Sequence, residues 1–344
     1  MNLKPNLYNI GLALTALSIG LFSCAGALAA DPKSEKKAAP PVFAQVGKVT
    51  ITQRQFDAAY AAASRNRFYH GKPPEAEVAA LQREIGEKLI TDALLLTEAK
   101  RLKLKPDAAE VKQNLEKIDQ RNSGKAQWQK IRDQALPVLT KQLEEENLRN
   151  QLEKRVRKVP APNEKQLRAY YDANPDKFTE PQQIRISIIL LGVDPGAPDF
   201  EAKLKLGEEL VKQLRAGADF AEMVKKYSTD SETVGQAGDM GYLHGGMLSE
   251  LSEQVANKLK PGEISDPVRL MEGVGIYKLT DRKEPKLNSF DAVKERATAL
   301  YIADEGERAW KSLIAKLRKN TPVKVDESRY LPLPKPAEAV PATK

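Results

Sequence analysis

The chain has 344 residues, of which 41% are hydrophobic, so it can bury the cores of two domains and is not a wholly disordered protein. Aromatic residues make up only 6% and charged residues 30%, and Ala, Leu, Glu and Lys are abundant. This composition favours helices with solvated faces and argues against an all-β sandwich. We expect an α+β fold in which helices dominate.

The net charge of +8 is unevenly distributed along the chain. Residues 41–160 carry 23 basic and 16 acidic side chains, residues 161–284 carry 16 and 21, and residues 285–344 carry 12 and 8. Two modules of opposite sign are therefore expected. Because the basic residues are interleaved with acidic ones, they indicate solvated helix faces, and we predict no nucleic-acid partner.

The first 29 residues have the pattern of a secretory signal peptide. Lys4 supplies positive charge, residues 10–22 form an uncharged apolar run, and Ala27–Ala29 offers a small-residue cleavage site. We predict export to the periplasm and removal of residues 1–29. The alternative is a lipoprotein anchored to the membrane through Cys24, the only cysteine, whose preceding residues resemble a lipoprotein processing box.

A Lys-, Ala- and Pro-rich stretch follows the cleavage site, and we interpret residues 30–40 as a flexible spacer. Two short strands are then predicted, at Val42–Val46 and Val49–Ile51, around a tight turn. Thr52 and Gln55 stand three residues apart, which is the spacing of a capping box. A helix is expected to begin there.

Helical periodicity dominates the rest of a first domain that we place at residues 41–160. Asp107 starts a new helix, and residues 128–156 form a further helical stretch in which Pro137 should cause a break or a kink. The Pro-rich step before residue 163 marks the boundary. The helix up to Pro106 is indicated by apolar residues at helical spacing, namely Ile85, Leu89, Ala93 and Leu96.

A second domain is expected at residues 161–284. Asn163 with Gln166 predicts a helix start, Ile184–Leu191 a buried strand, and residues 274–279 a closing strand. Between the two strands we expect helices at 200–216 and 220–227, and then a Gly-rich loop that leads to Met247.

The last part of the chain should contain a helix at 289–319 and a short strand at 323–325. We assign residues 285–328 to a segment that packs on the first domain. Residues 329–344 are Pro-rich and are predicted to be a disordered tail.

Residues 183–282 resemble the parvulin (rotamase, PpiC-like) family of peptidyl-prolyl cis-trans isomerases. The motifs that carry this resemblance occur in the family's order: Ile184–Leu191, Phe220-Ala221 with Tyr227-Ser228, Gly238-Asp239-Met240-Gly241, and Leu259–Ser265 with Pro267-Val268. The resemblance implies a small antiparallel sheet with surrounding helices.

The first domain is similar to the helical chaperone domain of the SurA/PrsA group, in residues 85–111 and in the Tyr170–Phe178 lead-in to the second domain. In that group a C-terminal helix returns to complete the chaperone domain, which would place residues 289–325 against residues 42–51. The resemblance implies unfolded or nascent exported polypeptides as partners.

The parvulin resemblance also implies a site. Its apolar pocket corresponds to Ile188, Met240, Met247 and Leu251. Leu251 stands in place of the usual aromatic residue. Asp230 stands where the family has Cys or Asp and is the candidate catalytic residue.

Other polar positions of the parvulin site are altered in this chain. The two family histidines correspond to Ile188 and Gly275, and a usual hydroxyl residue corresponds to Leu270. The prolyl bond has a rotation barrier of ~18–20 kcal/mol, which parvulins lower with an apolar pocket and polar groups around the peptide. We therefore expect an exported folding factor with weak or lost isomerase activity.

Two alternatives to this function are an active isomerase and a factor that assembles one secreted or envelope product. His244 could replace a lost histidine near Met247, but a solvent-facing loop residue is the commoner role, and His70 is interpreted as a turn residue. No metal or cofactor is expected, because the sequence lacks a His-Glu-x-x-His pattern and its Gly-rich segment 235–246 lacks the Lys and Ser/Thr of a phosphate loop.

Overall fold

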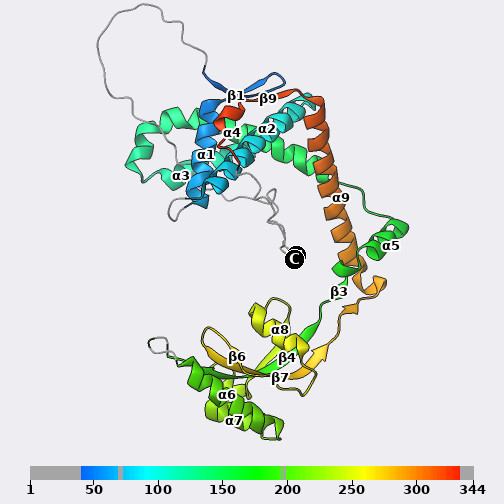
Figure 1. The fold of residues 1–344 in the computed structure, drawn as a ribbon. Helices are drawn as coiled ribbons and strands as arrows, with labels where there is room; N and C mark the ends of the chain where they lie inside the picture. The colour runs from blue at the N-terminus through cyan, green and yellow to red at the C-terminus, as the bar shows by residue number, and fades with distance from the viewer. Residues whose placement is uncertain (1–39, 69–72, 195, 197–198, 334–344) are drawn as a thin grey trace, which may run out of the picture. The chain divides into compact units, whose positions relative to one another are not determined.

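The computed structural model describes residues 40–68, 73–194, 196 and 199–333 (Figure 1). The predicted signal peptide, Cys24, nearly all of the spacer, His70 and the end of the tail lie outside these residues. The chain divides into two compact units. The first consists of the residues up to Pro160 together with those from Ile302 onward, and the second of Ala161–Tyr301.

The first unit contains a three-stranded antiparallel sheet in the order β2-β1-β9. The predicted hairpin is confirmed as β1 (Val42–Val46) and β2 (Val49–Thr52). The predicted C-terminal strand is confirmed as β9 (Val323–Val325), which pairs with β1. Segments almost 280 residues apart in sequence thus share one sheet.

Four helices of the first unit follow the hairpin, and two of them begin with a side-chain cap. Thr52 and Gln55 form the predicted capping box of α1 (Gln53–Arg67). Asp107 accepts hydrogen bonds from two backbone amides at the start of α3 (Ala108–Asn122). The other two helices are α2 (Glu75–Arg101) and α4 (Ala126–Arg157).

The sequence predicts a break or a kink at Pro137, and the break is wrong, because α4 continues through this residue. A proline removes the hydrogen bond to the carbonyl four residues earlier, here that of Asp133. Pro137 lies on the exposed side of α4, and the Asp133 side chain is also exposed. Water can therefore hydrate the carbonyl that has lost its partner, and the helix persists.

The core of the first unit is built around the aromatic rings of Phe43 and Phe56, which stack with their centroids 4.2 Å apart. The Tyr330 ring meets both of them edge-on. Next to it, the backbone of Leu331 accepts a hydrogen bond from Arg83. The prediction of a disordered tail at 329–344 is therefore wrong for the first residues of that segment, because the Tyr330 ring packs against this core. Burial also raises the pKa of the Tyr330 hydroxyl to about 12.

The C-terminal helix α9 (Phe290–Asn320) contributes its last turns to the first unit. Trp310 is buried there among leucines of α2 and α4. Arg157 of α4 forms an ion pair with Glu307, and its guanidinium lies over the Trp310 ring. These contacts complete the helical module, as the resemblance implied, and the predicted α+β class is confirmed.

The second unit begins with α5 (Glu164–Ala173), which starts at the predicted Asn163 capping box. A short turn of 3-10 helix (Pro175–Lys177) leads to β3 (Thr179–Glu180), which pairs with β8 (Lys286–Leu287). Phe178 is fully buried beside the first turns of α9.

A four-stranded antiparallel sheet in the order β5-β4-β7-β6 forms the centre of the second unit. Its strands are β4 (Gln183–Gly192), β5 (Asp239–His244), β6 (Val268–Arg269) and β7 (Gly273–Lys283). The helices α6 (Phe200–Arg215) and α7 (Phe220–Tyr227) pack on one face, and α8 (Glu250–Lys258) packs on the other (Figure 1).

The strand β5 lies where the sequence predicted only a Gly-rich loop, so that prediction is wrong for residues 239–244. Leu243 is buried and pairs with Ile184 of β4, and this long-range pairing compensates for the low strand propensity of glycine. Two short 3-10 turns, Val234–Gln236 and Glu327–Arg329, complete the described elements. In the described part of the chain, no helix combines the length and the hydropathy that a membrane crossing requires.

Gly86 is predicted to be essential for the core of the first unit. A β-carbon at this position would lie 1.9 Å from the Tyr330 hydroxyl oxygen, so Gly86→Ala must displace the ring. We expect a loss of about 1–3 kcal/mol in the stability of this unit. Both tryptophans of the chain, Trp128 and Trp310, lie in it, so their fluorescence during urea unfolding reports the change. Gly124→Ala is the control, because nothing lies within 4 Å of a β-carbon there. Equal unfolding midpoints for the two variants would contradict the prediction.

Candidate functional site

The face of the second unit's sheet that α8 covers is almost entirely apolar. Alternate residues of each strand point toward α8, as the period of two in a strand requires. The buried members of this cluster are Ile184, Ile186, Ile188, Leu243, Ala256, Val268, Tyr277 and Leu279. Met240 and Leu270 are partly buried against them. This cluster forms the floor of the candidate site.

The structure brings together three of the positions at which the sequence departs from the parvulin pattern. A β-carbon at Gly275 would lie 2.8 Å from Cδ1 of Leu270 and 3.6 Å from Cδ1 of Ile188. Ile188 itself is only 6% exposed. The space beside Gly275 is therefore occupied by the side chains of Leu270 and Ile188 and by the end of the Tyr277 ring, and no side chain can be added there without moving Leu270.

A chain of hydroxyl groups that was not predicted from the sequence lies between α8 and β7. The Tyr277 hydroxyl is hydrogen-bonded to Oγ of Ser252 at 2.9 Å, and Ser252 to Oγ of Ser249 at 2.8 Å. Burial raises the pKa of the Tyr277 hydroxyl, which therefore stays protonated at neutral pH. This hydroxyl lies 3.5 Å from the β-carbon position of Gly275 and is the polar group nearest to it.

The rim of the site carries two exposed apolar side chains. Met247, just before α8, is 52% exposed, and Leu251, at the start of α8, is 49% exposed. Ser249 caps this helix by accepting a hydrogen bond from the Ser252 amide. Covering exposed Met and Leu side chains with another apolar group lowers the free energy, because apolar surface is removed from water. This rim is therefore suited to contacting apolar segments of a polypeptide.

The candidate catalytic residue, Asp230, uses its carboxylate within its own loop. One oxygen accepts a hydrogen bond from the Thr233 hydroxyl at 2.5 Å, and the other from the Glu232 amide at 3.1 Å. The preceding Thr229 amide donates to the Leu190 carbonyl and ties this loop to β4. These bonds give Asp230 a structural role in the turn.

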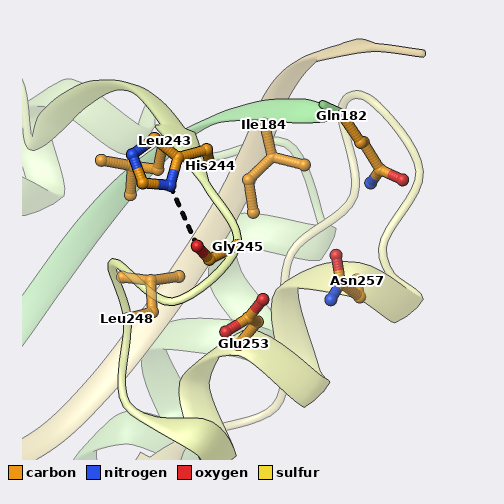
Figure 2. Close-up of a pocket in the computed structure, with 8 residues that line it drawn as sticks. All are labelled: Gln182, Ile184, Leu243, His244, Gly245, Leu248, Glu253 and Asn257. Carbon is orange, nitrogen blue, oxygen red and sulfur yellow. Dashed lines mark hydrogen bonds between the residues drawn. The ribbon is translucent and has the colours of Figure 1, made fainter. Parts of the chain in front are cut away.

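His244 lines a pocket of about 140 Å³ on the β5 side of α8, which shares Ile184 and Leu243 with the floor of the candidate site (Figure 2). Its Nδ1 atom donates to the Gly245 carbonyl at 2.9 Å. The pocket is lined by Gln182, Ile184, Leu243, His244, Gly245, Leu248, Glu253 and Asn257. It does not include Ile188, Met240 or Gly275. Across the described ranges, no group of three or more His, Cys, Asp or Glu side chains could hold a metal ion.

Comparison with known proteins identifies both units. A family model for the SurA-like N-terminal domain matches residues 6–158, and one for the PPIC-type PPIASE domain matches residues 189–281. The chain is 30% identical over 264 residues to the foldase protein PrsA of Clostridium botulinum (strain Langeland), which covers 73% of this chain and 75% of that protein. The chain belongs to the SurA/PrsA family of parvulin-domain proteins.

Other relatives of this SurA/PrsA family member match over shorter segments. The foldase protein PrsA of Geobacillus kaustophilus is 36% identical over 132 residues, which are 38% of this chain and 41% of that protein. The periplasmic chaperone PpiD of Haemophilus ducreyi is 31% identical over 41% of this chain and 21% of its own length. A solved structure of a SurA-like chaperone of Campylobacter jejuni is 18% identical, covers 80% of this chain and 96% of its own, and gives a TM-score of 0.37.

The packing beside Gly275 can be tested by adding one methyl group. Gly275→Ala should lower the stability of the second unit by about 1–3 kcal/mol, because the new β-carbon meets Leu270. Adding Leu270→Ala should remove much of this penalty, which a double-mutant cycle on thermal unfolding measures. Gly235→Ala is the control in the same unit, since its β-carbon would have no neighbour within 4 Å. Additive effects of the two substitutions would contradict the described packing.

Proposed function

We propose that this chain is an exported folding factor that binds unfolded client polypeptides and has weak or no prolyl isomerase activity. The observation that carries the proposal is the hydrocarbon packing of Ile188 and Leu270 around Gly275. Rotation about a prolyl bond is slow because amide resonance must be broken, and parvulins combine an apolar pocket with polar groups around the twisted peptide. Here the apolar part persists, and the positions of the two family histidines carry no polar side chain.

Client binding is supported by the exposed apolar rim of the site. Met247 and Leu251 present hydrocarbon to solvent just before and at the start of α8, the helix that covers the apolar floor. Such a surface can accept many sequences, because an unbranched Met side chain adapts its shape to its partner. Relatives named as foldases and as a periplasmic chaperone support the same role.

We further propose that the protein acts after export. The pattern of residues 1–29 and the relative named as a periplasmic chaperone support a periplasmic location, and acylation at Cys24 remains the alternative by which the chain would be held at a membrane. The predicted domains, 41–160 and 161–284 with a returning segment 285–328, also remain a proposal. A dedicated role in assembling one secreted or envelope product is a narrower version of the same function.

An active isomerase is the second candidate function. It is favoured by the apolar members of the site, because Met240 packs on the same floor as Ile188, and the exposed Met247 and Leu251 lie just before and at the start of α8, which covers that floor. In that case Asp230 would be the polar group of the site, and Asp230→Ala would abolish prolyl turnover.

Suppression of client aggregation tests the first proposal. The full chain should reduce light scattering from a chemically unfolded client as it is diluted from denaturant. Met247→Ser with Leu251→Ser should raise the concentration needed for half suppression by roughly tenfold, since covering half-exposed Met and Leu side chains contributes on the order of 1–2 kcal/mol.

The matched control is Met271→Ser with Leu287→Ser, in which the same residue types, 89% and 49% exposed in the same unit, are changed outside the site. The control should behave like the unmodified chain. Absence of suppression by the unmodified chain, or equal losses in the two double variants, would refute the proposal.

A further inference from the structure

A groove of about 400 Å³ lies on the opposite side of α8 from the pocket of Figure 2. One wall is α8, and the other is the segment 264–269 that includes β6. The residues that line it are Arg215, Leu251, Val255, Lys258, Leu259, Ile264, Ser265, Asp266, Pro267, Val268 and Arg269. Its volume is within the range of ligand-binding clefts.

The groove is preformed, because hydrogen bonds to β7 hold its outer wall. The Ser265 amide donates to the Tyr277 carbonyl at 2.8 Å, and the Tyr277 amide donates to Oγ of Ser265 at 2.9 Å. Ile264 forms an isolated bridge with Lys278 of the same strand. A ligand that enters the groove therefore does not have to order this wall, which lowers the entropic cost of binding.

The floor of the groove is apolar and is continuous with the rim of the candidate site. Val255, Leu259 and Val268 pack against the same cluster as Ile188. Leu251 belongs both to the exposed rim and to the lining of the groove. A chain that covers Met247 and Leu251 can thus continue along α8 into the groove without leaving apolar surface.

The rim of the groove is positive, although the unit that contains it is acidic. Arg215, Lys258 and Arg269 outnumber Asp266 among the lining residues, whereas residues 161–284 carry 16 basic and 21 acidic side chains. Asp266 is neutralised by its ion pair with Arg215, at 2.9 Å. Arg269 lies 4.0 Å from Glu201 of α6, which is not a lining residue of the groove. With both acidic partners counted, the rim keeps one excess positive charge, opposite in sign to the charge of its surroundings.

We propose that this groove binds an extended polypeptide segment whose apolar side chains are flanked by acidic residues. The proposal rests on the proposed function, since it names the class of client segment that the second unit selects. The apolar floor accepts the hydrophobic side chains, and the basic rim pairs with the flanking carboxylates. A nucleic acid is disfavoured, because its affinity depends on many phosphate contacts and the rim offers few basic residues.

Two labelled, proline-free peptides test the proposal. They share one Leu- and Val-rich centre and are flanked either by Glu or by Lys. Fluorescence anisotropy with the full chain at low salt should show three- to tenfold tighter binding of the Glu-flanked peptide, the range expected for a few exposed charge pairs. The difference in affinity should shrink in 0.5 M salt. The Debye length there is about a third of its value at low salt, so the exposed charges are screened.

Charge reversal on the rim makes the test specific. Lys258→Glu with Arg269→Gln should remove or invert the preference for the Glu-flanked peptide. The control is Lys205→Glu, because Lys205 is an exposed residue of α6 outside the groove. This variant should keep the preference for the Glu-flanked peptide. Equal binding of the two peptides by the unmodified chain, or equal losses in the rim variant and the control, would overturn the proposal.

The outcomes for this groove and for the proposed function can be separated. Met247→Ser lies outside the groove and should keep the charge preference. A chain that shows this preference but does not suppress client aggregation would contradict the proposed function and leave the groove assignment standing. A chain that suppresses aggregation but shows no preference for the Glu-flanked peptide would overturn the groove assignment and leave the proposed function standing.

Discussion

Hydrocarbon packing around Gly275 is the constraint on which the rest of the site depends. Leu270, from the turn between β6 and β7, and Ile188, from β4, converge on a position without a side chain. Because protein interiors are close-packed, three neighbouring positions must change together if one of them is to carry a larger or polar group. Replacing one residue in this chain would therefore not recreate a polar parvulin site.

The position of Tyr277 follows from the same packing. It stands two residues after Gly275 on β7 and so points to the same face of the sheet. Its ring fills the floor, and its hydroxyl reaches Ser252 of α8. A buried hydroxyl without a partner would be costly, and the Ser249–Ser252 pair removes that cost while fixing the start of α8. The exposed rim at Met247 and Leu251 is thereby held on a rigid support.

Local features of the fold could be predicted from the sequence, because their causes lie within a few residues. The capping boxes at Thr52 and Asn163 depend only on neighbouring backbone amides, and both are present. The features that could not be predicted depend on distant partners. The strand β5 exists because Leu243 pairs with Ile184, and the start of the tail is ordered because Tyr330 packs on Phe43.

For the site, the resemblance identified the altered positions, and the structure shows how they fit together. That Ile188 and Leu270 close around Gly275 could not be read from the sequence, since about 80 residues separate the two strands. The resemblance made Asp230 the candidate catalytic residue. The structure adds that its carboxylate accepts hydrogen bonds from Thr233 and Glu232 within its own loop. The hydroxyl chain through Ser252 was not predicted from the sequence.

The most direct test of this account is the rate of prolyl cis-trans exchange in a short X-Pro peptide, measured by exchange NMR with and without the full chain. Uncatalysed exchange takes tens to hundreds of seconds. The account predicts that the chain leaves this rate essentially unchanged, because Ile188 and Gly275 supply no polar side chain at the positions of the two family histidines. A clear acceleration that Asp230→Ala or Met247→Ala abolishes would contradict it and would establish an active isomerase.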